Sequence, residues 1–246
     1  MKGIDSLNAH LNEFEKKRNE LGISFTGDRK AYADHIAECF IPCARWILAG
    51  HFRVTNSEYD SQVIRRIYPT AIELYYHEEG EGRFKDPIMY HANDRKRADN
   101  QDYFSNRGFN SIPYYPFGSL NPHTSGIDIT FENPKEQYRA SFLIREYEVD
   151  YGKGIKIPVK NSTDIYDDML ISGICLDNAD WIEWCDGLLV DDSDIIRKWR
   201  KNVPDYRPKA DKPGEWEKNP DGDNTFSSAG GRFAKCPFNW QFRIKK

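Results

Sequence analysis

The chain has 246 residues, of which 39% are hydrophobic and 30% are charged, and its formal net charge is -4. This length fits one folded domain over residues 1–246, and the hydrophobic content excludes a disordered chain. No run of 18 apolar residues and no apolar secretory leader occurs, so we expect no membrane-spanning helix and no membrane partner. The five cysteines have no regular spacing, which favours a reducing compartment, and we expect a cytoplasmic monomer.

Residues 1–68 are predicted to form a helical N-terminal region. Three apolar residues recur at the i, i+4, i+7 spacing of one helix face, namely Leu7, Leu11 and Phe14. Asp28 is a suitable N-cap for a second helix, which Pro42 is expected to interrupt. A third, short helix is expected to begin at Ser57 and to continue through Ile67.

The segment 69–203 is predicted to be an α+β core that begins with a strand directly after Pro69. Apolar side chains alternate there with other residues, at Ile72, Leu74 and Tyr76. Because successive side chains of a strand point to opposite faces, Glu73 and Tyr75 should share the face that turns away from the core.

Further strands are expected at 127–131 and 141–147, joined by a turn at 132–135, and a strand is expected at 155–159. Short helices should follow Ser162 and Asp192.

The C-terminal part begins with a segment, residues 204–225, that is rich in Pro, Lys, Asp and Gly and is predicted to be an exposed loop. Residues 226–246 are then predicted to return to the core as a strand. Helices followed by strands with few crossovers indicate an α+β fold.

Two strand residues suggest chemistry. Glu73 lies beside the aromatic ring of Tyr75, and a carboxylate can act as a general base toward water. A solvated strand face explains the same pattern. Arg145 lies inside an apolar strand and requires a carboxylate or a ligand, since an unpaired buried charge is costly. Its partner in a structural network would be Glu73, Asp128 or Glu146.

Two histidines are weaker candidates. His91 follows the turn at Asp86-Pro87, and His123 precedes the strand that carries Asp128. No spacing typical of a metal site occurs among them, so we expect no metal and no organic cofactor. A metal-dependent hydrolase built on His91, His123 and neighbouring acids stays an alternative.

The charge of the chain is unevenly distributed, because the segment 146–194 is strongly acidic and the segment 197–246 is basic. A basic contact face for nucleic acid would produce this asymmetry, and so would a basic tail that packs on the acidic segment or is simply solvated.

Several short patterns, taken in their order, resemble the alkyladenine (methylpurine) DNA glycosylases, also called 3-methyladenine DNA glycosylases. The matching segments are Glu73-Leu74-Tyr75, Asp86-Pro87 with His91, Leu143-Ile144-Arg145 followed by Glu148, and Gly231-Arg232 followed by Trp240-Gln241-Phe242-Arg243. The resemblance covers roughly residues 69–150 and the C-terminal end. The tyrosine-rich strand pair of that family is replaced here by residues 118–128.

This resemblance implies a mixed, mainly antiparallel curved sheet with packed helices, and a mechanism that flips a base out of double-stranded DNA containing a damaged base. Glu73 would activate the water that attacks the sugar carbon. The residues that would bind the base or organise its pocket are Tyr75, His91, His123, Asp128 and Arg145. The alternative is a non-enzymatic protein that keeps the fold and binds a nucleotide, a small ligand or a protein.

Overall fold

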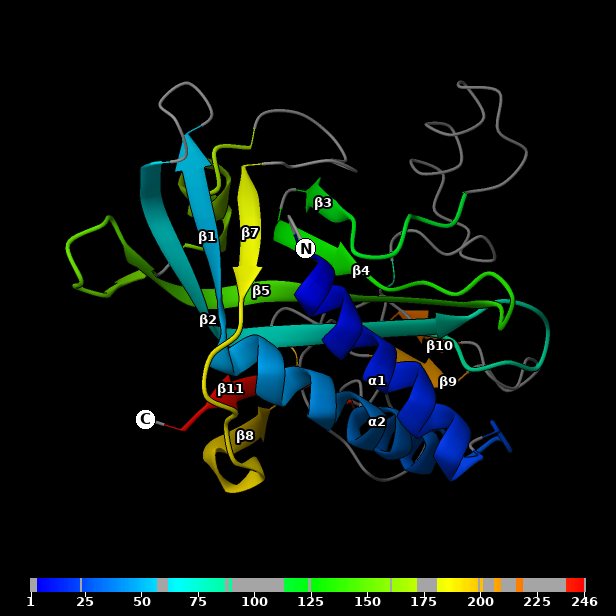
Figure 1. The fold of residues 1–246 in the computed structure, drawn as a ribbon. Coiled ribbons are helices and arrows are strands. Elements are labelled where there is room, and N and C mark those ends of the chain that lie inside the picture. The colour runs from blue at the N-terminus through cyan, green and yellow to red at the C-terminus, as the bar shows by residue number, and fades with distance from the viewer. Residues whose placement is uncertain are drawn as a thin grey trace.

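The computed structural model shows a mixed α+β architecture in which a curled antiparallel sheet, with nine strands among the described residues, is covered by helices (Figure 1). The structure describes residues 4–22, 24–56, 62–86, 89, 113–123, 125–159, 161–171, 181–198, 200, 206–208, 216–218 and 238–245.

Helix α1 (Asp5–Leu21) buries the predicted face of Leu7, Leu11 and Phe14. It ends at Gly22, whose φ of 58° lies in the left-handed region that favours glycine. The expected apolar spacing therefore places this helix correctly.

Helix α2 (Arg29–Ala49) begins as predicted at Asp28, whose side chain accepts a hydrogen bond from the amide of Ala31 at 3.0 Å. The expected interruption at Pro42 is wrong, because the helix continues through this residue. Its apolar side packs on α1 and on the sheet, and this packing outweighs the one hydrogen bond that proline removes.

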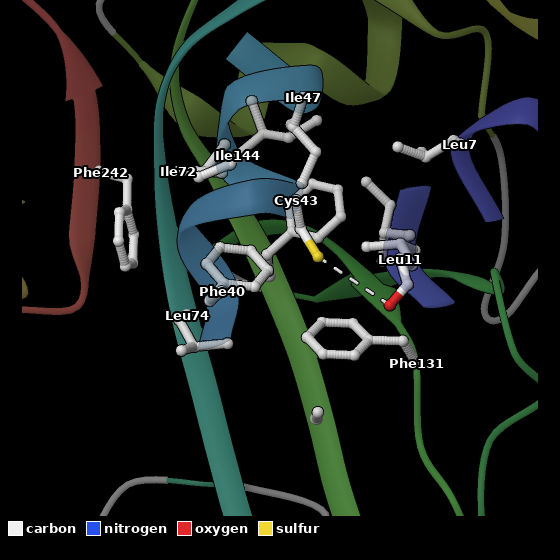
Figure 2. Packing of buried hydrophobic residues seen from close by; sticks show 14 of the residues in the cluster. Leu7, Leu11, Phe40, Cys43, Ile47, Ile72, Leu74, Phe131, Ile144 and Phe242 are labelled. Carbon is white, nitrogen blue, oxygen red and sulfur yellow. Dashed lines mark hydrogen bonds between the residues drawn. The ribbon is translucent and has the colours of Figure 1, made fainter. Parts of the chain in front are cut away.

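Figure 2 shows the core between α2 and the sheet. Phe40 and Ile47 of α2 face Ile72 and Ile144 of the sheet, and these four side chains are fully buried. Cys43, also fully buried, points instead toward α1, where its thiol donates to the Leu11 carbonyl at 3.9 Å. The C-terminal end of the chain joins the same core, since the Trp240 indole donates a hydrogen bond to the Ala33 carbonyl at 2.9 Å.

The predicted helix between Ser57 and Ile67 is wrong, and the helical region does not extend to residue 68. Strands β1 (His51–Asn56) and β2 (Gln62–Glu78) form an antiparallel pair there. β-Branched residues in both segments favour extended backbone, and each strand supplies the hydrogen-bond ladder of the other.

The sheet has the strand order β3-β4-β5-β2-β1-β7, and all of its pairs are antiparallel. The strands not yet bounded are β3 (Leu120–His123), β4 (Gly126–Thr130), β5 (Tyr138–Asp150), β6 (Ile157–Val159), β7 (Ile182–Cys185), β8 (Ile195–Lys198) and β11 (Gln241–Ile244). β6 pairs with β5, and β11 pairs with β2 and β8. The strands predicted at 127–131, 141–147 and 155–159 are thus confirmed. The strand predicted within 226–246 is confirmed at β11, and residues 226–237 of that prediction lie outside the described residues.

The register between β2 and β5 shifts at two places, between Pro69 and Ala71 and between Ala71 and Ile72. On β5 the second shift makes Arg145 an extra residue, since Ile144 and Glu146 pair with the successive residues Ile72 and Ala71. Such a bulge re-aims the side chains beside it. Arg145 and Glu146 are accordingly only partly buried, whereas residues 138–144 before them are all buried.

The short helix predicted after Ser162 is confirmed as the turn η1 (Ser162–Asp164) followed by α4 (Ile165–Asp168). The helix predicted after Asp192 is wrong, because the turn η2 (Asp192–Asp194) leads into β8. Two neighbouring isoleucines open this segment, and pairing with β11 satisfies its backbone.

The exposed loop predicted for residues 204–225 contains two strands among its described residues, β9 (Tyr206–Pro208) and β10 (Trp216–Lys218), which pair antiparallel. The prediction is wrong for these six positions. Aromatic residues in both segments favour extended backbone, although the composition between them is typical of a loop.

Candidate functional site

A row of side chains crosses four strands on the sheet face opposite the helices. Asp128 of β4 lies opposite Leu143 of β5, Leu143 opposite Glu73 of β2, and Glu73 opposite Gln241 of β11. Cross-strand partners place their side chains on the same face. Residues from three distant parts of the chain therefore meet around Glu73.

Glu73 is fully buried, and both of its carboxylate oxygens accept hydrogen bonds. Oε2 accepts from Arg145 Nε at 2.6 Å and from the Tyr75 hydroxyl at 3.1 Å. Oε1 accepts from Gln241 Nε2 at 2.9 Å. The alternative explanation, a solvated strand face, is therefore wrong, because both faces of β2 are covered at this point.

Arg145 completes a closed triangle of hydrogen bonds, since its Nη2 also donates to the Tyr75 hydroxyl at 3.1 Å. Burial acts against the charged guanidinium, but Tyr75 and the Glu73 carboxylate outweigh it and raise the pKa of Arg145. Burial and the nearby Glu73 charge hold the pKa of Tyr75 well above its ordinary value. Tyr75 thus keeps its proton and acts as a donor to Glu73.

A second buried ion pair lies against this triangle. Arg200 donates to both oxygens of Asp86, with Nη1 to Oδ2 at 2.7 Å and Nη2 to Oδ1 at 3.0 Å. Its guanidinium carbon lies 4.9 Å from the centre of the Tyr75 ring and 5.1 Å from that of Trp240. A cation therefore occupies one side of the Tyr75 ring, in the geometry of a cation–π contact.

A buried apolar cluster adjoins the polar groups, because Tyr75, Met89 and Leu143 pack together apart from the main core. The site thus combines a carboxylate, a guanidinium and a phenol with an aromatic ring that belongs to this apolar cluster.

The remaining predicted residues are distributed as follows. Asp128 is buried in the same row and is close enough to Tyr75 for its charge to contribute to the raised pKa of that phenol. His123 belongs to β3, where it pairs with Gly126. His91 lies outside the described residues, and so does the side chain of His123.

Of the three partners considered for Arg145, the structure selects Glu73. Glu146 instead forms an ion pair with Arg243. Sequence reasoning missed Arg200 and the hydrogen bond from Gln241 to Glu73. Nothing in the sequence distinguishes Arg200 from the other basic residues of its segment. Gln241, in contrast, belongs to a segment already noted for the family resemblance.

A comparable carboxylate, Glu78, lies further along β2 and is bound from the core side. It accepts hydrogen bonds from the hydroxyls of Tyr32 and Tyr76, the latter at 2.7 Å, and lies 3.5 Å from Arg18 Nη2. This cluster joins α1, α2 and the sheet, and it provides an internal reference for a carboxylate that is built into the core.

Within the described ranges, no group of three or more His, Cys, Asp or Glu side chains is arranged to hold a metal ion. None of the helices among the described residues is long and apolar enough to cross a membrane. Comparisons of the chain with protein-family models, with curated proteins and with solved structures gave no match.

Proposed function

We propose that this protein hydrolyses the N-glycosidic bond of a damaged, alkylated purine in double-stranded DNA, with Glu73 as the residue that activates water. The observation that carries the proposal is the contact of Arg145 Nε with Glu73 Oε2 at 2.6 Å, closed by the Tyr75 hydroxyl. The Glu-x-Tyr and Leu-Ile-Arg patterns, 70 residues apart along the chain, supply all three groups.

The energetics of the network support a functional role. Removing charged groups from water costs free energy that a buried ion pair only partly recovers, and apolar residues of similar volume stabilise such a position equally well or better. A carboxylate, a guanidinium, a phenol and an amide nevertheless occupy the centre of this sheet face. The bulge at Arg145 adds a backbone irregularity that directs the guanidinium toward Glu73.

In the proposed reaction, a water molecule bound to Glu73 transfers one proton to the carboxylate while its oxygen attacks the anomeric carbon of the sugar. The bond from this carbon to the base nitrogen breaks, and its electron pair leaves with the base. Arg145 and Gln241 hold the carboxylate in place. Once substrate binding has opened the site, the damaged base, flipped out of the duplex, lies against the ring of Tyr75.

The proposed reaction sets a condition on the site. Glu73 is fully buried and both oxygens are engaged, so substrate binding must open a path to it and a water must replace one of its contacts. The hydrogen bond from the Tyr75 hydroxyl to Oε2, at 3.1 Å, is the longest of the three hydrogen bonds to Glu73 described above. Its donor is uncharged, whereas the other donor to Oε2 is the Arg145 guanidinium.

The same burial favours a second candidate, a non-enzymatic protein that keeps the fold and binds a nucleotide, a small ligand or a protein. In this case Glu73, Arg145 and Tyr75 form a structural network, and the carboxylate has no water to activate.

The deciding experiment measures base release from duplex DNA that contains alkylated purines or hypoxanthine, with wild-type protein and with Glu73→Gln. The amide cannot take a proton from water, so the proposal requires release by the wild type and at least a hundredfold slower release by the variant. Glu78→Gln is the matched control, because it alters a buried carboxylate on the same strand that faces the core.

Each outcome selects one candidate. Loss of release in Glu73→Gln, with activity retained by folded Glu78→Gln, supports hydrolysis at Glu73. A wild-type protein that binds DNA in a salt-dependent manner but releases no base is a binder. A folded protein that neither binds DNA nor releases a base contradicts both the reaction and the DNA partner.

A further inference from the structure

One hydroxyl on the candidate site face lacks a hydrogen-bond partner among the described residues. Ser141 of β5 is fully buried, and its Oγ has neither a donor nor an acceptor within reach in that part of the chain. Its neighbour across the ladder, Thr130, is different, because Thr130 Oγ1 donates to the Pro116 carbonyl at 2.8 Å.

An unpartnered hydroxyl is unfavourable in the folded protein, since it leaves water and gains no hydrogen bond in return. Alanine would fill nearly the same space without this penalty. Buried polar groups are almost always satisfied, so each exception requires an explanation, and a bound ligand is one.

The position of Ser141 relative to the site gives that explanation. Ser141 lies directly opposite Tyr75, two positions along β5 from the residue opposite Glu73. The Cβ atoms of residues that lie directly opposite each other are about 4.5–5.5 Å apart. Two residues of a strand span about 7 Å along its axis. A flat ring with its reacting end at Glu73 and its face along Tyr75 therefore directs its far edge toward Ser141.

We propose that Ser141 Oγ is a hydrogen-bonding subsite for the edge of a purine base that lies furthest from the glycosidic bond. This inference rests on the proposed function, because it assumes that the base enters with its sugar at Glu73. A hydroxyl both donates and accepts, so the subsite takes a six-membered ring that carries either an amino or an oxo substituent. A ring with only a C–H group at that carbon offers ring N1 alone as an acceptor and loses the second hydrogen bond.

The test measures the binding of adenine, hypoxanthine and unsubstituted purine to wild-type protein and to Ser141→Ala by calorimetry, together with thermal unfolding of both free proteins. Ser141→Ala should raise the Tm of the free protein by about 2–4 °C, because it removes an unsatisfied hydroxyl. It should weaken the binding of adenine and hypoxanthine about 3- to 10-fold. Its affinity for unsubstituted purine should fall less than its affinities for adenine and hypoxanthine, because that edge of purine carries only the ring N1 acceptor.

A matched control is Thr130→Val on the adjacent strand, which removes a hydroxyl that is already satisfied. It should lower the Tm and leave the three affinities unchanged. Equal affinities of wild type and Ser141→Ala for adenine and hypoxanthine would overturn the subsite, as would a wild-type protein that binds none of the three bases.

Failure of the subsite and failure of the proposed function remain distinct. Base release that depends on Glu73 but not on Ser141 leaves the hydrolytic reaction in place and overturns the subsite. Binding of adenine that depends on Ser141, in a protein that releases no base from DNA, keeps the subsite and replaces hydrolysis by binding.

Discussion

Arg145 and Glu73 form a buried ion pair between the two longest strands of the sheet, with Nε 2.6 Å from Oε2. The pair is not a direct cross-strand pair, because Leu143 lies opposite Glu73. The bulge at Arg145 allows the guanidinium to reach along the strand to the carboxylate. β2 and β5, which run side by side in Figure 1, are thus connected by the Arg145–Glu73 contact as well as by their backbone ladder.

Loss of the guanidinium should be strongly destabilising. Arg145→Met leaves the Glu73 carboxylate buried with a charge partner removed, and we expect the free energy of unfolding to fall by about 3–5 kcal/mol. Urea unfolding measures this loss. The control is Arg53→Met, which breaks the ion pair of Arg53 with Glu183. Both of these side chains are more than one-third exposed, at 39% and 35%.

For this control we expect a loss of at most about 1 kcal/mol. Equal losses in the two arginine variants would mean that the Arg145–Glu73 pair is effectively solvated, contrary to its burial.

Asp150 should make stability sensitive to acid. The amides of Lys153 and Gly154 donate to its Oδ1 at 2.8 and 2.9 Å, and Arg66 donates to Oδ2 at 3.2 Å. Desolvation opposes ionisation, but these hydrogen bonds and the Arg66 charge outweigh it and lower the pKa of Asp150. Because the folded pKa lies below the unfolded one, the stabilisation is complete above the unfolded value, about 3.9, and is lost as the pH falls through the folded value.

The measurement is urea unfolding of wild-type protein and Asp150→Asn between about pH 2 and pH 6, the range that brackets the unfolded value. The difference in stability between the two proteins should be largest above pH 4 and should shrink toward the acid end of the range. A difference that grows as the pH falls would contradict the lowered pKa.

Phe40 is expected to be the most costly aromatic residue of α2 to truncate. Its ring contacts the rings of Phe14, Phe131, Phe142 and Phe242, which come from a helix, a loop and two strands. Phe40→Ala leaves a cavity that these elements share, and we expect a loss of about 3–5 kcal/mol in unfolding free energy. Leu188→Ala, at a side chain that is 95% exposed, should change stability by less than about 0.5 kcal/mol.

Gly187 is expected to tolerate no side chain, because backbone atoms of Ala49 occupy the space that its Cβ atom would need. A Cβ placed there would lie 1.9 Å from the carbonyl oxygen of Ala49, a backbone atom that cannot rotate away. Gly187→Ala should therefore cost about 1–3 kcal/mol or more, measured by thermal or urea unfolding. The control, Gly82→Ala, has no heavy atom near its Cβ and only a φ of 69° to oppose it.

For Gly82→Ala we expect about 1–2 kcal/mol, the cost of a left-handed residue with a side chain. A Gly187 variant as stable as the wild type would show that the loop after β7 shifts away from α2 without penalty.

Local patterns predicted those parts of the fold whose signal depends on near neighbours in the chain. The spacing of Leu7, Leu11 and Phe14 placed α1, and the acceptor at Asp28 placed the start of α2, because helix geometry and capping act within one or two turns. The same local logic failed at Val63 and Ile64. The apolar residues Val63, Ile64 and Ile67 are compatible with a helix and with a strand, and only the pairing of this segment with β1 decides between the two.

The candidate site divides in the same way. From the sequence alone, the alternation around Glu73 predicted that Glu73 and Tyr75 share one strand face, because strand periodicity is a local property. The apolar neighbours of Arg145 in the sequence likewise predicted that Arg145 needs a charged partner or a ligand, because a buried unpaired charge is costly. Only the tertiary structure decided that this face is buried, that Glu73 is the partner and that Gln241 completes its contacts. The physical reason is that cross-strand register and a strand bulge bring these residues together from positions far apart in the chain, and neither is encoded within any single segment.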